Sequence, residues 1–233
     1  MVVPKLDAPV IDSLEAAALE VAARLRARLP VPDQQFDRFL PDDLREASPV
    51  FWTPLEVILR AAQWLDEVGV KSVVDIGSGA GKFCVVGALA SRCSFIGIEQ
   101  RPRLVSAARD LAHRFGVEDR VRFVPAVFGE LTTPVADAYY LFNSFGENLF
   151  PPDGRLDDAA ELSQERYRRD IRALATWLRA APVGTFVLTY NGFGGRLPPD
   201  FENVRMDRAL PNVLRLSRKL GGGRSCSATS ATA

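Results

Sequence analysis

The sequence predicts an α/β fold: a three-layer α/β/α sandwich around a mostly parallel seven-stranded sheet with an antiparallel C-terminal strand. Short apolar runs of strand length alternate with helical patterns between residues 70 and 190. A glycine-rich turn follows the first of these runs, and two further strand-like runs come near the end of the chain. Alternating strands and helices of this kind form a parallel sheet that is covered by helices on both faces.

The first expected element is a helix over residues 12–29, where apolar side chains recur at helical spacing. Asp12 and Glu15 have the spacing of a capping box at its start, and Pro30 and Pro32 follow its end. This helix belongs to a helical extension that precedes the main domain and is expected to fold over the ligand side of the sheet.

The stretch that follows, residues 32–49, is rich in Asp, Phe and Pro and is predicted to be a loop. Thr53 and Pro54 are typical of a helix start, because a Thr side chain caps free N–H groups and Pro suits the first turn. A second helix is therefore expected up to Gly69.

Beyond residue 70 the apolar patterns give the remaining elements. Strands are expected at residues 73–76, 94–98, 121–124, 136–142, 185–190, 203–206 and 213–216, and helices at 82–91, 102–115 and 157–181. The predicted organisation is an extension over residues 1–48, a main domain over residues 49–220 and a low-complexity, disordered tail over residues 221–233.

The amino-acid composition indicates which kinds of binding partner and which cellular compartment to expect for this protein. The 29 basic and 29 acidic residues balance, so no net field favours a nucleic acid or an anionic membrane, and neither is expected as a partner. Cys84, Cys93 and Cys226 are odd in number and lack metal-ligand spacing, which predicts no metal site and a reducing cytoplasm. The chain shows neither a signal-peptide pattern nor an apolar run of membrane-spanning length. The oligomeric state stays open.

The turn "DIGSGAGKF" has the glycines of a ligand site, but its spacing differs from two common nucleotide motifs. A triphosphate-binding loop has four residues between its glycines and a Ser or Thr after its lysine. Here Gly77 and Gly81 enclose three residues, and Phe83 follows Lys82. The dinucleotide fingerprint G-x-G-x-x-G does not match either, because Gly81 follows Gly79 after one residue and gives the pattern G-x-G-x-G.

Two acidic residues narrow the identity of the ligand. Glu99 ends the second expected strand, where a carboxylate can accept the hydroxyl groups of a ribose. Asp75 lies two positions before the first glycine, where it would repel a pyrophosphate and attract a cationic amino-acid group. The pattern therefore favours S-adenosylmethionine, a nucleoside with a charged amino-acid tail and no phosphate.

The same segments resemble motifs of the class I S-adenosylmethionine-dependent methyltransferases. "DIGSGAGKF" is similar to the first motif of that family, "FIGIEQ" to the acidic second motif, and "DRVRFVPAVFGE" to the third strand with its adenine-side loop. "DAYYLFNSFGEN" occupies the place of the fourth strand and catalytic loop, and "SPVFWTPLEV" resembles the Thr-Pro segment before the first motif. The resemblance extends in order over residues 53–190.

The resemblance implies a role for each matching position. The residues implied to contact the methionine end of the cofactor are Asp75, Gly77, Ser78, Gly79 and Gly81, and Thr53 is also implied to bind the cofactor. Glu99 would hold the ribose, Gln100 and Arg101 would edge the adenine, and Val127 and Phe128 would face its ring. Asn143 would bind the cofactor and act as the catalytic residue beside the transferable methyl group, in "NSF", a sequence that lacks the prolines of the amino-group methyltransferase motif.

Methyl transfer from a sulfonium depends mainly on proximity and orientation. This fits a chain whose single histidine, His113, lies in an expected helix away from the turn. An oxygen acceptor would also need a general base, for which Glu147, Asp137 and Tyr190 are candidates.

The methyl acceptor, whether a small molecule or a protein, is left open. The loop over residues 190–200 is predicted to be a lid with Asn191 and Phe193 as substrate contacts, or else a tight turn. A non-catalytic S-adenosylmethionine-binding module and an NAD-dependent oxidoreductase remain alternative functions.

Overall fold

The computed structural model describes residues 13–130 and 132–221, in which seven strands form one sheet of order β3-β2-β1-β4-β5-β7-β6. The strands are β1 (Ser72–Ile76), β2 (Ser94–Glu99), β3 (Val121–Pro125), β4 (Ala138–Phe142), β5 (Phe186–Tyr190), β6 (Phe201–Asp207) and β7 (Leu214–Lys219). Neighbours among β1 to β5 pair in parallel, whereas β7 runs antiparallel to both β5 and β6. The predicted mostly parallel sheet with an antiparallel last strand is confirmed.

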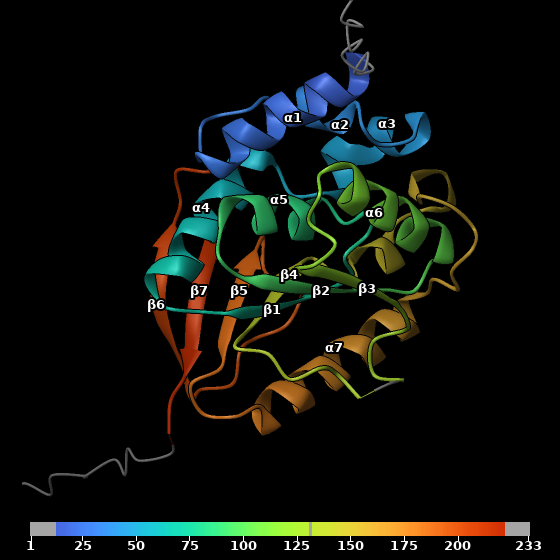
Figure 1. Ribbon diagram of the computed structural model, residues 1–233. Helices are drawn as coiled ribbons and strands as arrows, with labels where there is room; N and C mark the ends of the chain where they lie inside the picture. The colour runs from blue at the N-terminus through green and yellow to red at the C-terminus, as the bar shows by residue number, and fades with distance from the viewer. Residues whose placement is uncertain (1–12, 131, 222–233) are drawn as a thin grey trace, which may run out of the picture.

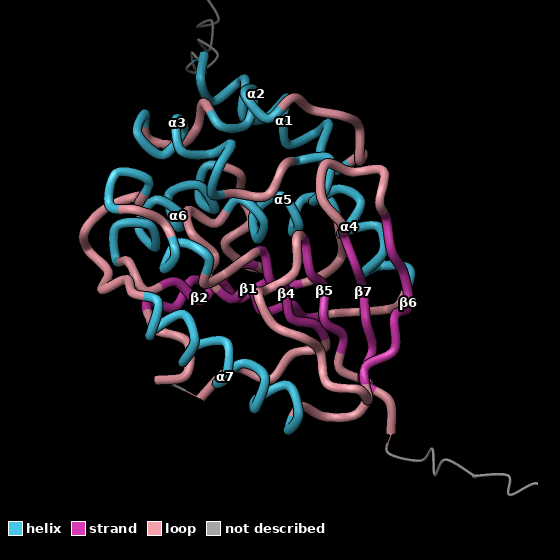
Figure 2. Tube along the Cα trace, turned by 180° about the vertical axis from the view of Figure 1, so that it is seen from behind, coloured by secondary structure: helices cyan, strands magenta, loops and turns pink. Residues whose placement is uncertain are grey.

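Helices cover both faces of this sheet, but unequally. The α-helices are α1 (Ser13–Arg26), α2 (Asp33–Asp37), α3 (Asp42–Phe51), α4 (Leu55–Glu67), α5 (Lys82–Ala90), α6 (Pro102–Arg114) and α7 (Gln164–Ala180). Helices α1 to α6 lie on one face and α7 lies on the other, as Figure 1 shows and Figure 2 repeats from behind. The three-layer arrangement is therefore the predicted one. Asp12 of the expected capping box and residues 222–233 of the expected tail lie outside the described residues.

The loop predicted over residues 32–49 is wrong, because the chain forms α2 and α3 there. Phe36 is fully buried and stacks on Phe115 at the end of α6, with ring centroids 4.9 Å apart. Leu44 of α3 is also fully buried. Helices this short depend on such tertiary contacts, so a search for repeated helical spacing misses them.

A buried ion-pair cluster joins these short helices to the start of α5. The Lys82 ammonium is 1% exposed and lies 2.6 Å from Asp33 Oδ1 and 2.7 Å from Asp37 Oδ1. It also donates a hydrogen bond of 3.2 Å to Ser48 Oγ in α3. The lysine of the glycine-rich turn therefore holds the N-terminal segment in place. The proposed division at residue 48 falls inside α3, and α1 and α5 belong to the same hydrophobic core.

The helix expected after Thr53 and Pro54 is present as α4, but Thr53 does not cap it. Helix α4 begins at Leu55, and Thr53 Oγ1 forms a 2.6 Å hydrogen bond with the Tyr140 hydroxyl of β4. The Leu55 N–H donates instead to Asp33 Oδ1 at 3.0 Å. A carboxylate 22 residues away in the chain thus replaces the local cap.

Helix α7 begins at Gln164, seven positions later than predicted. Asp157 Oδ1 forms an ion pair with Arg101 Nε at 2.7 Å. This ion pair keeps the chain around Asp157, which precedes α7, out of the helix. The Ser163 side chain then caps α7 by accepting the Arg166 N–H at 3.1 Å.

We expect Lys82→Met to destabilise the protein by about 3–5 kcal/mol, because it leaves the Asp37 carboxylate buried without its partner. Chemical unfolding measured by circular dichroism checks this value. Asp37→Asn in the Lys82→Met background should recover part of the loss, because it removes the unpaired charge.

Lys71→Met is the matched control, because Lys71 is exposed. A loss below about 1 kcal/mol in Lys82→Met would show that the cluster does not hold the segment.

Candidate active-site cleft

A cleft opens at the carboxyl ends of the parallel strands, where the loops after β3, β2, β1 and β4 meet. The empty space between its walls amounts to about 980 Å³, which includes space open to solvent. The strand-end residues that line it are Ile76, Gly77, Gly79, Ile98 to Arg101, Ala126 to Phe128 and Phe142 to Phe145. Val50, Phe51 and Trp52 close one side of the cleft, but they follow the predicted extension, and none of its described residues, 13–48, belongs to the lining.

The glycine-rich turn contributes Gly77 and Gly79 to this lining. Gly79 has a φ of +55°, and a Cβ added to it would lie 2.2 Å from Trp52 Nε1. Only glycine therefore lets the indole pack on the turn. Gly81 serves packing instead, because a Cβ there would lie 2.7 Å from Ala108 Cβ and 2.6 Å from a ring atom of Phe123.

Glu99 ends β2 inside the cleft and is 6% exposed. Its Oε2 accepts the Gly79 N–H at 3.1 Å and its Oε1 accepts the Arg101 N–H at 2.9 Å. Burial raises the pKa of Glu99 above its ordinary value, although these N–H groups and the Arg101 charge oppose the rise. Each carboxylate oxygen keeps a further lone pair, so Glu99 can still accept hydroxyl groups of a ligand.

Asp75 lies in β1 beneath the turn and does not belong to the cleft lining. It is 3% exposed, and its nearest polar partner is the Cys84 thiol, 3.5 Å from Oδ2. Burial raises the pKa of Asp75 from 3.8 to about 7, and the nearby Glu99 charge adds to this effect.

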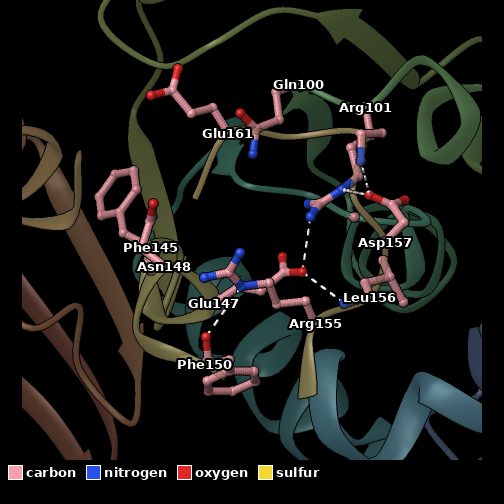
Figure 3. A network of polar contacts seen from close by, with 12 residues as sticks. Gln100, Arg101, Phe145, Glu147, Asn148, Phe150, Arg155, Leu156, Asp157 and Glu161 are labelled. Carbon is pink, nitrogen blue, oxygen red and sulfur yellow. Dashed lines mark hydrogen bonds and ion pairs between the residues drawn. The ribbon is translucent and has the colours of Figure 1, made fainter. Parts of the chain in front are cut away.

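Two ion-pair groups hold the segment between β4 and α7 against the end of β2. Figure 3 shows Arg101 between Glu147 and Asp157, at 2.9 Å and 2.7 Å respectively. The Glu147 carboxylate also accepts the Leu156 N–H at 2.8 Å. The sequence predicts that Arg101 lies at the edge of an adenine. Its ion pairs hold this wall of the cleft together.

Gln100 has a similar partner in Arg166 of α7, whose guanidinium donates to the Gln100 side chain. Arg166 also lies 3.4 Å from the Asp170 carboxylate, one turn later in the helix. Both α7 residues line the cleft.

The loop after β4 places Asn143 and Ser144 in the cleft. Asn143 has a φ of +45°, a conformation that Asn tolerates better than most residues, and its N–H donates to Gly192 O at 3.1 Å. Ser144 packs against Gly77, and its buried Oγ has no hydrogen-bond partner among residues 13–130 and 132–221. A ligand in the cleft would therefore find polar groups of this loop available.

Most of the site residues predicted from sequence meet in this cleft. Those that line it are Gly77, Gly79, Glu99, Gln100, Arg101, Val127, Phe128 and Asn143. Those that lie outside its lining are Thr53, Asp75, Ser78 and Gly81. Thr53 is held by Tyr140 in β4, and Ser78 packs on Gly97 of β2, so neither faces the cleft.

Only one of the three candidate bases lies in the cleft. Glu147 lines it but is already paired with Arg101. Asp137 lies at the opposite end of the sheet, where it accepts the N–H groups of Lys71 and Ser72. Tyr190 is 1% exposed, packs against Phe142 and does not line the cleft.

The loop after β5 does not form a wall of this cleft. Phe193, expected as a substrate contact, is 3% exposed and packs in a core cluster with Leu174 and Leu178 of α7. Asn191 is exposed and also lies outside the lining. Neither residue is part of the lining, and their contact with a substrate stays a prediction.

Sequence reasoning missed several cleft residues. They are Val50, Phe51, Phe142, Ser144, Phe145, Phe150, Leu156, Leu162, Arg166 and Asp170. Phe142 and Ser144 directly flank Asn143, so their proximity to the motif was the available signal. Arg166 and Asp170 lie on a helix whose register against the sheet is a tertiary property, and no local pattern points to them.

The described residues contain no group of three or more potential ligands placed to hold a metal ion. His113 is exposed on α6 and pairs with Glu118 at 2.7 Å, far in sequence from every residue of the lining loops. No helix of the described chain has the length and apolar character needed to cross a membrane.

Comparisons with known proteins place this geometry in context, although no protein-family model matches the chain. Ribosomal protein L11 methyltransferases from Escherichia coli strains are 38% identical over 61 residues, which is 25% of this chain and 21% of theirs. The chain therefore spans about a fifth of the length of these curated relatives.

Solved structures share the fold over most of the chain. An RNA methyltransferase from Salinibacter ruber, crystallised with S-adenosyl-L-homocysteine, matches 74% of this chain and 96% of its own, with a TM-score of 0.52 at 19% identity. A mitomycin 7-O-methyltransferase matches 88% of this chain and 68% of its own, also with a TM-score of 0.52, at 18% identity. The chain has the fold of class I S-adenosylmethionine-dependent methyltransferases, and neighbours with such different acceptors give no ground for excluding a nucleic acid.

Asp75→Asn tests the raised pKa of Asp75. The folded state keeps the proton that the unfolded state loses near pH 4, so the ionisation of Asp75 costs stability as the pH rises from about 4 to about 7. Relative to wild type, the Asn variant should therefore gain stability across this interval, by at most about 4 kcal/mol, and level off above it. Urea unfolding at pH 5, 6, 7 and 8 measures the difference.

Asp119→Asn at an exposed position is the control. A stability difference between Asp75→Asn and wild type that does not vary with pH would refute the raised pKa.

Proposed function

We propose that this chain is an S-adenosylmethionine-dependent methyltransferase. The observation that carries the proposal is the joint placement of a glycine-rich turn and a buried carboxylate at neighbouring strand ends in one cleft. Gly77 and Gly79 follow β1, and Glu99 ends the adjacent β2. Ligands of open α/β sheets bind at this edge.

The cleft fits the cofactor in three respects. Glu99 has accepting capacity for ribose hydroxyl groups, and Val127 and Phe128 after β3 supply a wall with apolar side chains for an adenine. Ser144 Oγ, which lacks a partner among the described residues, offers a polar group beside Gly77. These features support the assignment of the cofactor to this cleft.

Bound S-adenosylmethionine supplies an electrophilic methyl group on a sulfonium, which needs no acid to leave as a thioether. The residues of the chain then have to orient the acceptor and exclude water. Phe145 and Phe150 provide aromatic surface for this purpose, and Asn143 provides an amide at the loop after β4. Asn143 is proposed as the residue beside the transferred methyl group, and Asp75 as a support beneath the turn.

Glu147 is the carboxylate of the acceptor side, and its ion pair with Arg101 disfavours its use as a strong base. An acceptor that is itself nucleophilic, or that loses its proton to solvent, suits this site best. The acceptor is proposed to be a small molecule or a macromolecule of this chemistry. Cys84 and Cys93 are buried free thiols, which supports the reducing cytoplasm as the proposed compartment.

Calorimetric titration with S-adenosylhomocysteine, with NAD as the comparison ligand, tests the proposal. We expect the wild-type protein to bind the former at micromolar concentration and not the latter. Glu99→Ala should weaken this binding by about 10- to 100-fold, because it removes hydrogen bonds to a charged acceptor.

Glu118→Ala, at an exposed position in the turn after α6, is the control and should bind as wild type. Binding of NAD alone would favour the oxidoreductase alternative. Binding of S-adenosylhomocysteine without methyl transfer to any acceptor would favour the non-catalytic module. Folded protein that binds neither ligand would remove the proposed function.

A further inference from the structure

Trp52 is a cleft residue whose polar group is not used by the fold. It follows α3, is 7% exposed and lines the cleft beside the glycine-rich turn. Its indole nitrogen is the nearest atom to the position that a side chain of Gly79 would take. The indole N–H therefore lies over the turn.

Within the described ranges, 13–130 and 132–221, no residue forms a hydrogen bond with this N–H, and the nitrogen is not one of the atoms that are both fully buried and without a partner. The N–H is therefore open to the cleft that Trp52 lines. Other polar groups of the same segment do have partners, since Thr53 bonds Tyr140 and the Leu55 N–H bonds Asp33. The indole N–H of Trp52 is thus a donor that the fold leaves available to a ligand.

The order of the strands predicts which part of the ligand lies near Trp52, and this step rests on the proposed function. The strand order β3-β2-β1-β4 places the loop with Val127 first, Glu99 second and the glycine-rich turn third. If the adenine lies at the Val127 loop and the ribose at Glu99, the aminoacyl tail lies over Gly79, next to Trp52.

The neighbouring cationic side chains are already paired with carboxylates of the chain. The neutral N–H of Trp52 therefore remains as a donor for the carboxylate of the aminoacyl tail. Arg101 is held by Glu147 and Asp157. Arg166 lies against Asp170, and Lys82 is held by Asp33 and Asp37, so each of these positive charges is balanced by a carboxylate of the chain.

We propose that the Trp52 indole N–H binds the carboxylate of the aminoacyl tail and makes the cleft selective for nucleosides that carry this tail. An indole N–H is only a donor, so it suits an anionic oxygen. A hydrogen bond to a charged group in a buried position is among the stronger kinds. Trp52 is thereby a specificity residue for the cofactor.

The test compares two ligands on two variants by calorimetry. S-adenosylhomocysteine carries the aminoacyl tail, and 5′-methylthioadenosine has the same nucleoside and a thioether without it. Trp52→Phe keeps an aromatic ring and removes the N–H, while Trp64→Phe alters an equally buried tryptophan of α4. We expect Trp52→Phe to lose about 10- to 100-fold in affinity for S-adenosylhomocysteine and to bind 5′-methylthioadenosine like wild type. Trp64→Phe should leave both affinities unchanged.

A second measurement keeps Trp52 intact, in case Trp52→Phe does not fold. The chain has three tryptophans, so the double variant Trp64→Phe with Trp177→Phe leaves Trp52 as the only fluorophore of this kind. Its emission should shift with S-adenosylhomocysteine and not with 5′-methylthioadenosine.

The outcomes separate the inference from the proposed function. Wild-type protein that does not bind S-adenosylhomocysteine overturns both. If wild type and Trp52→Phe bind S-adenosylhomocysteine equally, only the role of Trp52 is overturned. If Trp52→Phe loses equal affinity for both ligands, Trp52 acts through packing, and its proposed role is overturned as well. An emission of Trp52 that S-adenosylhomocysteine leaves unchanged would also overturn this role.

Discussion

The buried ammonium of Lys82 organises the cleft side of this protein. Its contacts with Asp33 and Asp37 join α2 to the first residue of α5, and Ser48 extends the cluster to α3. Burial of the Lys82 and Asp37 charges costs solvation energy that well-packed apolar side chains would avoid, so the cluster is better explained by placement than by stability. It sets the position of the segment that leads to Trp52, and hence of the indole over the glycine-rich turn.

Glu99 and Asp75 are both carboxylates near the glycine-rich turn, but their surroundings give them different roles. Glu99 accepts two backbone N–H groups and faces the cleft, so its carboxylate stays available as an acceptor although burial raises its pKa. Asp75 receives a contact from the Cys84 thiol and lies beneath the turn, so burial dominates its pKa. In a methyltransferase site, Glu99 would contact the cofactor, and Asp75 would support the glycine-rich turn from below.

The opposite wall depends on charge pairs between distant parts of the chain. Arg101 follows β2, yet it binds Glu147 after β4 and Asp157 before α7 (Figure 3). Arg166 of α7 reaches back to Gln100 in the same way. These contacts keep about 20 residues without regular strand or long helix against the sheet, and they explain why α7 starts late. They also commit the only candidate base in the cleft, Glu147, to a structural partner.

The sequence by itself determined the sheet, its antiparallel last strand and the chemistry of the turn, because short apolar runs, helical spacing and the positions of the glycines and Glu99 can be read along the chain. It could not show α2 and α3, which are too short to repeat a pattern, nor the caps and pairs made by residues far apart in the chain. Tertiary structure alone decided that Gly81 packs, that Thr53 and Asp75 lie outside the lining, and that Trp52 and Arg166 lie inside it. The reason is that a side chain's direction and neighbours depend on contacts between elements, whereas motif spacing fixes only its place along the chain.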